Sequence, residues 1–94
     1  MIIVTAKNIL KEGNSEKFKE LAKDLISETR KENGCISYNL NQDIKNQDIL
    51  TFIEEWESEE ALQLHMNTLH FTSIVPKLSE LQEENSILNI YNRV

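Results

Sequence analysis

His65 is the side chain best placed for acid–base chemistry near neutral pH. It shares a helical stripe with Ala61, Leu62 and Leu69, which predicts that its imidazole faces a sheet rather than solvent. In such an apolar setting the imidazole can act as a general base. The alternative is a buried structural histidine that donates to a backbone carbonyl.

His70 is the second candidate for acid–base catalysis. It lies about 140° around an uninterrupted helix from His65, so the pair lacks the i, i+4 spacing of a helical metal site. A break near Asn67 would leave the relation of the two rings open, and His70 could instead cap or pack at a helix start. No metal site is therefore predicted.

Glu55 and Trp56 alternate across a predicted strand. If Trp56 faces the helices, Glu55 faces the other side, with Ile49 and Ile53, toward a cavity or a subunit interface. A carboxylate in such a place must be hydrogen-bonded or ion-paired. Glu55 is thus a candidate for the substrate pocket or for an interface ion pair, and Trp56 for the core or a pocket wall.

Tyr38, Phe52 and Phe71 are the remaining candidates for a substrate pocket. The Tyr38 hydroxyl could bond an oxygen substituent of a ligand, although a packed strand tyrosine is the commoner case. Phe52 and Phe71 are expected to be core residues or pocket wall. Cys35 has no neighbour in sequence that would lower its pKa, so inert packing is expected.

The elements that must position these residues follow from the hydrophobic period. Residues 2–10, 36–41, 49–56 and 87–94 read as strands, and a helical stripe begins at Ser15. Asn14 or Ser15 is expected to cap that helix, and Gly34 to supply its left-handed stop. Ser58 begins a second helix, and after a break near residues 67–68 the helical stripe resumes.

The resulting order is β-α-β-β-α-β, the arrangement of a ferredoxin-like α+β fold, in a single domain of residues 1–94. Helices cover only one face of such a sheet, yet residues 49–56 carry apolar side chains on both faces. A second apolar face needs a partner, most simply the same sheet of another subunit. The sequence therefore predicts a homodimer.

Composition excludes several classes of function. The formal net charge of −6 and the presence of only two arginines argue against nucleic-acid binding. No apolar run reaches the roughly 20 residues of a membrane span, and the first residues lack the basic region of a signal peptide. A single cysteine fits a reducing, cytoplasmic setting. The only two glycines, Gly13 and Gly34, lie too far apart in the sequence for a Walker or dinucleotide-binding loop.

Three segments carry a resemblance to a known family. They read E-x-G-C-x-x-Y over residues 32–38, E-x-W over residues 54–56 and H-x-x-T-x-H-F over residues 65–71. In this order they resemble the antibiotic biosynthesis monooxygenase family, which includes bacterial quinol monooxygenases and small dimeric α+β-barrel proteins. The resemblance covers essentially the whole chain.

The resemblance implies oxygenation without flavin, haem or metal. In that chemistry a small quinol or polyphenol-like substrate is deprotonated and itself supplies an electron to O2, inside an apolar cavity that excludes water. His65 is then the candidate base. The family's haem-degrading branch uses an Asn, a Trp and a His. His65 stands at the position of that tryptophan and Val75 at that of the histidine, which argues against haem degradation.

The sequence is also compatible with two other functions. One is an isomerase of a phosphorylated linear sugar-like signal, against which the shortage of arginine argues weakly. The other is a dimer that binds a small ligand in the same cavity without catalysis.

Overall fold

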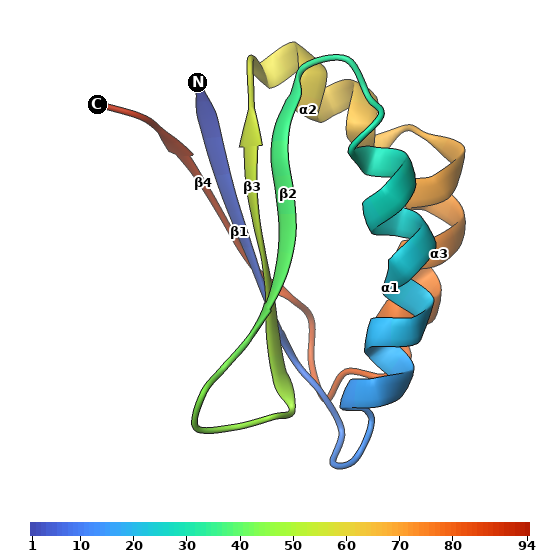
Figure 1. Cartoon of the computed structure of the whole chain (residues 1–94). Coiled ribbons are helices and arrows are strands. Elements are labelled where there is room, and N and C mark those ends of the chain that lie inside the picture. Colours follow the sequence, from blue (N-terminus) through green and yellow to red (C-terminus); the bar gives the residue numbers. More distant parts are fainter.

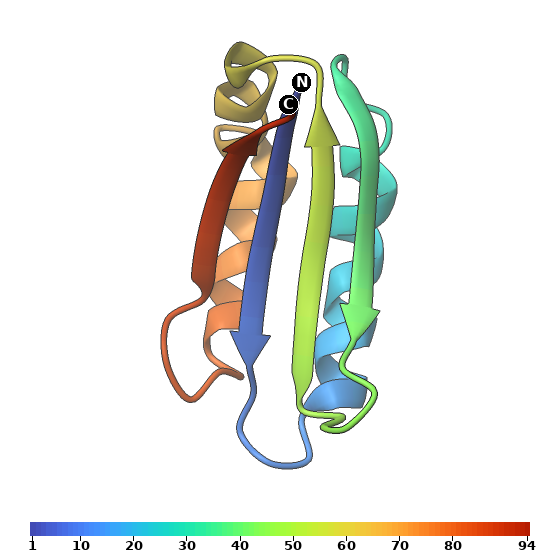
Figure 2. The same ribbon diagram turned by 90° about the vertical axis from the view of Figure 1, so that its left-hand side faces the viewer.

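A four-stranded antiparallel sheet with the strand order β2-β3-β1-β4 forms one layer of the protein. The computed structural model describes all of residues 1–94. Its elements are β1 (Ile2–Ile9), α1 (Ser15–Thr29), β2 (Cys35–Gln42), β3 (Ile49–Trp56), α2 (Glu59–Met66), α3 (Leu69–Ser79) and β4 (Ile87–Asn92). The helices lie on one side of the sheet and leave its other face uncovered (Figures 1 and 2). The predicted ferredoxin-like α+β fold is confirmed.

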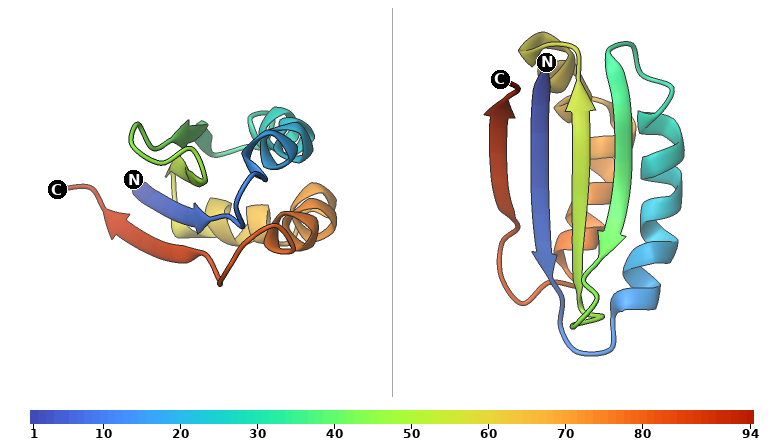
Figure 3. Two further views of the ribbon diagram at one scale, coloured as in Figure 1. Left: turned by 90° about the horizontal axis from the view of Figure 1, so that it is seen from below. Right: turned by 60° about the vertical axis from the view of Figure 1, so that its left-hand side comes forward.

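Alternation along the strands builds the core between the two layers. On β3, Leu50, Phe52, Glu54 and Trp56 are buried toward the helices, whereas Ile53 on the outer face is 43% exposed. The amphipathic stripe of α1 packs against this face, as the sequence predicts; its buried members are Ser15, Phe18, Ala22, Leu25 and Thr29. Figure 3 shows the helices gathered on one side of the curved sheet.

Both ends of α1 differ from the sequence prediction. Asn14 is the N-cap residue, but its side chain makes no capping hydrogen bond, and the helix ends at Thr29, before Gly34. Gly34 has a φ of 84°, and a Cβ added there would lie 2.5 Å from the Cβ of Ala61. Gly34 therefore lets the connection between α1 and β2 pack closely against α2, instead of stopping α1.

The second helical region is divided, as the sequence predicts. The Ser58 side chain caps α2 by accepting from the Ala61 N–H, and the Thr68 side chain caps α3 by accepting from the Phe71 N–H. This second helix start turns the chain, so Leu69 points into solvent with 82% exposure. The predicted place of Leu69 on the buried stripe of His65 is wrong, because the stripe assumes one uninterrupted helix.

No helix of the protein combines the length and the apolar character needed to cross a lipid bilayer.

Candidate active site

A cavity of about 240 Å³ lies between the sheet and the helices. Twelve of its 17 lining residues are hydrophobic, and the other five are Asn8, Glu54, His65, Gln82 and Ser86. No lysine or arginine lines it. The cavity therefore suits a largely apolar and uncharged ligand that presents a few polar atoms.

The sequence candidates divide into two groups with respect to this cavity. Four of them line it: Tyr38, Phe52, His65 and Phe71. The other three, Glu55, Trp56 and His70, are not among its lining residues. Trp56 is fully buried in the core beneath His65, with 4.6 Å between the ring centroids.

Glu55 lies on the face of the sheet that points away from the helices, because it alternates with the inward-facing Trp56. Instead of the predicted contact with a pocket, its carboxylate accepts hydrogen bonds from the Ser37 hydroxyl at 2.7 Å and from the Arg93 guanidinium at 3.0 Å. The ion pair considered for Glu55 is therefore formed within one chain.

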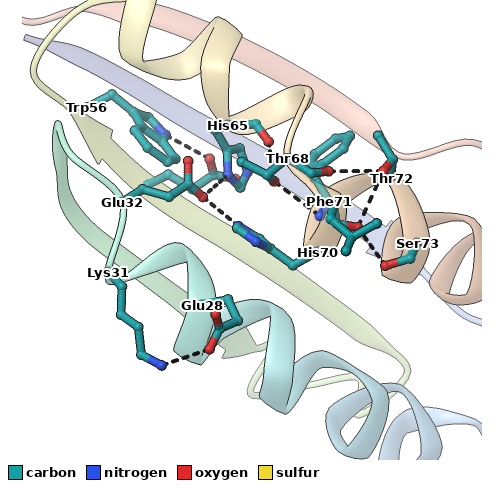
Figure 4. Close-up of polar contacts among 12 residues, drawn as sticks. Glu28, Lys31, Glu32, Trp56, His65, Thr68, His70, Phe71, Thr72 and Ser73 are labelled. Atoms are coloured by element: carbon teal, nitrogen blue, oxygen red, sulfur yellow. Dashed lines mark hydrogen bonds and ion pairs between the residues drawn. The ribbon is translucent and has the colours of Figure 1, made fainter.

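Glu32 joins the two histidines into a hydrogen-bonded triad (Figure 4). Its Oε2 atom accepts from His65 Nδ1 at 2.8 Å and from His70 Nε2 at 2.7 Å. Glu32 lies in the connection between α1 and β2, and the histidines come from α2 and α3. The break between these two helices is what brings both rings to the same carboxylate.

The tautomer of His65 follows from this contact. An ionised carboxylate only accepts, so Nδ1 carries the proton and Nε2 keeps its lone pair. Nε2 makes no hydrogen bond within the chain, and the residue lines the cavity. Burial lowers the pKa of His65, and the hydrogen bond to Glu32 opposes this shift. At neutral pH His65 is therefore an uncharged acceptor with an oriented ring.

Aromatic rings hold the His65 imidazole in place. Besides Trp56, they are Phe71 and Tyr38, whose ring centroids lie 5.0 and 5.5 Å from that of His65. Burial raises the pKa of the Tyr38 phenol, so this hydroxyl stays neutral. Tyr38 thus offers packing and a neutral hydroxyl, and it does not compete with His65 as a base.

Glu54 is a further buried acidic residue of the cavity. It is 5% exposed, and its Oε1 atom accepts a hydrogen bond from Trp56 Nε1 at 2.9 Å. Burial raises the pKa of Glu54 to about 7, and the bond from Trp56 opposes the shift. The cavity therefore contains a carboxylic acid, Glu54, together with the uncharged acceptor His65.

Glu32 and Glu54 are absent from the candidates drawn from the sequence. Glu54 could have been found, because strand alternation places it on the inner face with Phe52 and Trp56. Glu32 lies in a connection, where no hydrophobic period shows the direction of a side chain.

The triad also offers one ligand atom from each residue, all within 4.8 Å of one another. Ligands of a tetrahedral zinc ion lie about 3.4 Å apart, given zinc–nitrogen bonds of about 2.0–2.1 Å. Glu32 Oε2 is closer than that to both nitrogens, at N–H···O distances. The arrangement fits a carboxylate that orients two imidazoles better than it fits a zinc site.

Comparison with known proteins identifies the family of the chain. The sequence model of the antibiotic biosynthesis monooxygenase family matches residues 1–77. The chain is 31% identical over 81 residues to the protein named "Putative monooxygenase YcnE" of Bacillus subtilis, with 86% of this chain and 85% of YcnE covered. It is 34% identical over 90 residues to the uncharacterized protein sll1783 of Synechocystis sp. This match covers 95% of this chain and 61% of the length of sll1783.

Among solved structures, a conserved protein from Methanosarcina mazei Go1 superposes with a TM-score of 0.96 and 43% identity, covering 99% of this chain and 92% of that one. This solved structure has the same fold over nearly the whole chain. The chain belongs to the antibiotic biosynthesis monooxygenase family.

Proposed function

We propose that this protein is a cofactor-independent monooxygenase that oxidises a small, neutral quinol or polyphenol-like substrate with O2. The observation that carries the proposal is the Glu32–His65 pair beside an apolar cavity with no cationic side chain. Membership of a monooxygenase family supports the same reaction class.

His65 would begin the reaction as the general base. Its Nε2 atom accepts the phenolic proton, and Glu32 stabilises the imidazolium that results. The apolar walls exclude water, so the phenolate is poorly solvated and electron-rich. It gives one electron to O2, and the two radicals combine to form a carbon–oxygen bond and a peroxide.

The overall reaction needs no other reductant. The imidazolium returns its proton to the peroxide, and the ring carbon then loses its hydrogen as the O–O bond breaks. One oxygen atom stays on the substrate as a carbonyl, and the other leaves as water with the phenolic and ring hydrogens. The substrate supplies all four electrons, so a phenol with a free ring C–H becomes a quinone.

The charge of the cavity separates this function from the isomerase alternative. A phosphorylated substrate needs Lys or Arg near the phosphate. The cavity has neither, and the Glu32 carboxylate next to His65 would repel a phosphate. A neutral aromatic substrate suits the cavity better.

Oxygen uptake is the direct test. Metal-depleted protein should consume O2 with at least one member of a panel of naphthols and hydroquinones, above the rate without protein, and chelator should not change the rate. Uptake that needs added metal would contradict the cofactor-independent mechanism. A complete lack of uptake, with a panel member bound in the cavity, would favour a binding protein.

We also propose that the protein works as a cytoplasmic homodimer. The outer face of the sheet carries half-exposed apolar side chains, including Ile53, Ile87 and Tyr91. Leu88 and Ile90 of β4 line the cavity yet are about half exposed. A second copy against this sheet and β4 would bury both sets and help to close the cavity.

A further inference from the structure

We propose that Glu54 is a second catalytic group of the cavity: its neutral carboxyl group donates a hydrogen bond, and later a proton, to an oxygen atom of the ligand. The proton-transfer step rests on the proposed function, whereas the hydrogen bond to a ligand does not.

The position of Glu54 in the fold favours the neutral, protonated form of its carboxyl group. It lies on the central strand β3, opposite Val4 of β1 and Tyr38 of β2, and faces the helices. Its one hydrogen bond comes from Trp56 Nε1, and no cationic side chain lines the cavity. An ionised carboxylate buried with a single neutral donor is costly, so protonation is favoured.

The surroundings on every side agree with a protonated Glu54. Of the other lining residues only Tyr38 from β2 and His65 from α2 titrate, and both are neutral near pH 7; β1, α1, α3 and β4 contribute no titratable group. The charge of Glu32, behind His65, further favours the protonated form. The raised pKa of Glu54, about 7, has the same causes, burial first.

The arrangement also defines the ligand. The Glu54 Oε1 atom accepts the hydrogen bond from Trp56 Nε1, and Oε2 makes no hydrogen bond within the chain. Oε2 can therefore carry the proton and donate it to a ligand. His65 Nε2 is an acceptor. A cavity with one donor and one acceptor fits a neutral aromatic molecule that has a hydroxyl group and a second oxygen able to accept.

In the reaction, Glu54 would act when the O–O bond of the peroxide breaks. Its proton passes to the departing hydroxide, which becomes water. His65 takes the proton that the ring carbon loses, and this proton then returns through water to the Glu54 carboxylate. Both residues end in their starting states, and the overall balance of the reaction is unchanged.

A purely structural role for Glu54, holding the Trp56 indole, makes a different prediction. Binding of 1-tetralone, a neutral bicyclic ketone without a titrating group, separates the two by calorimetry. If Glu54 donates, wild-type affinity falls about tenfold from pH 6.5 to pH 8, as the carboxyl group loses its proton. Glu54→Gln keeps a donor and an acceptor at all pH values, so its affinity should not change with pH.

The control is Glu60→Gln, which removes an exposed carboxylate of α2 and should behave as wild type. Circular dichroism establishes that each variant is folded. Wild-type binding that does not depend on pH, no binding at pH 6.5, or the same pH dependence in Glu54→Gln would each overturn the proposal.

The outcomes also distinguish this proposal from the proposed function. If tetralone binds with the expected pH dependence but no phenol supports O2 uptake, the oxygenase proposal fails and the donor role of Glu54 stands. If O2 uptake occurs and Glu54→Gln keeps the wild-type pH profiles of both binding and kcat/KM, the oxygenase stands and Glu54 is structural.

Discussion

His65 owes its chemistry to its orientation by Glu32. Because Glu32 Oε2 accepts from Nδ1, the opposite nitrogen is left free for a substrate proton. A carboxylate also stabilises the protonated ring, so it opposes the lowering of the His65 pKa by burial. Glu32, a residue outside α2, therefore affects both the orientation and the basicity of the His65 imidazole.

The first prediction separates His65 as a base from His65 as a structural residue. His65→Gln keeps a side chain that can hydrogen-bond to Glu32 but has no basicity near neutral pH, and it should lower turnover about a hundredfold or more. Glu32→Gln should lower the His65 pKa further, so the acidic limb of the rate profile moves to lower pH. Steady-state kinetics across pH measures both effects, and full turnover by folded His65→Gln would exclude the base role.

The second prediction concerns the effect of Glu54 on stability. Its pKa is about 7 in the folded protein, raised from an ordinary value of 4.5, so between these two pH values the folded state holds a proton that the unfolded state has lost. The free energy of unfolding of the wild type therefore falls as pH rises through this window. Glu54→Gln should gain about 2–3 kcal/mol relative to wild type between pH 5 and pH 8.

Urea unfolding at both pH values measures this difference, with Glu60→Gln as the control for a lost exposed carboxylate. A difference between Glu54→Gln and wild type that stays constant with pH would mean that Glu54 is ionised in the folded protein throughout the range.

At the scale of elements, the close packing of the α1–β2 connection on α2 fixes where Glu32 meets His65. Gly34 makes this contact: its φ is 84°, and an added Cβ would meet the Ala61 Cβ at 2.5 Å. Gly13 has the same φ, but an added Cβ there meets nothing within 4 Å. A substitution of either glycine therefore meets the same backbone strain, but only at Gly34 does it also meet a packed neighbour.

The third prediction uses this difference. Gly34→Ala should destabilise the protein by about 1–3 kcal/mol more than Gly13→Ala, because overpacking adds to the strain that both share. It should also lower turnover, because the Glu32 carboxylate is displaced from His65. If thermal or urea unfolding shows equal losses of stability for the two variants, the α1–β2 connection accommodates the added Cβ at residue 34 without a loss of free energy, and the prediction is wrong.

The periodic elements are what the sequence predicts well. The stripe of α1 and the alternation of β3 follow from burial of one face, which is a local property of the sequence. The approach of His65 and His70 to the same Glu32 carboxylate is not local. It depends on the turn at residues 67–68, and the same turn exposes Leu69.

Glu32 and Glu54 show two different limits of prediction from sequence. The direction of Glu32 is set by tertiary packing of a connection, so no pattern in the sequence could reveal it. Glu54 follows the alternation of β3, but a carboxyl group on an inner face is understood only when the apolar cavity around it is known.

At the scale of the whole molecule, the uncovered sheet face determines the expected assembly. The fourth prediction is that Ile53→Asp, at the centre of this face, converts a dimer into a monomer, because a buried unpaired charge opposes association. Leu64→Asp is the control, since Leu64 is 69% exposed on α2, away from the sheet face. Analytical ultracentrifugation at micromolar concentration measures both, and a monomeric wild type would exclude the dimer.

The proposed reaction carries an oxygen atom of O2 into the substrate by the action of this chain's residues alone. Reaction of metal-depleted protein with an accepted phenol under ¹⁸O2, followed by mass spectrometry, measures this most directly. We expect one labelled oxygen atom in the quinone product and one in water, with this product nearly absent for His65→Gln. An unlabelled product with the label in hydrogen peroxide, or labelling that requires added metal, would contradict it.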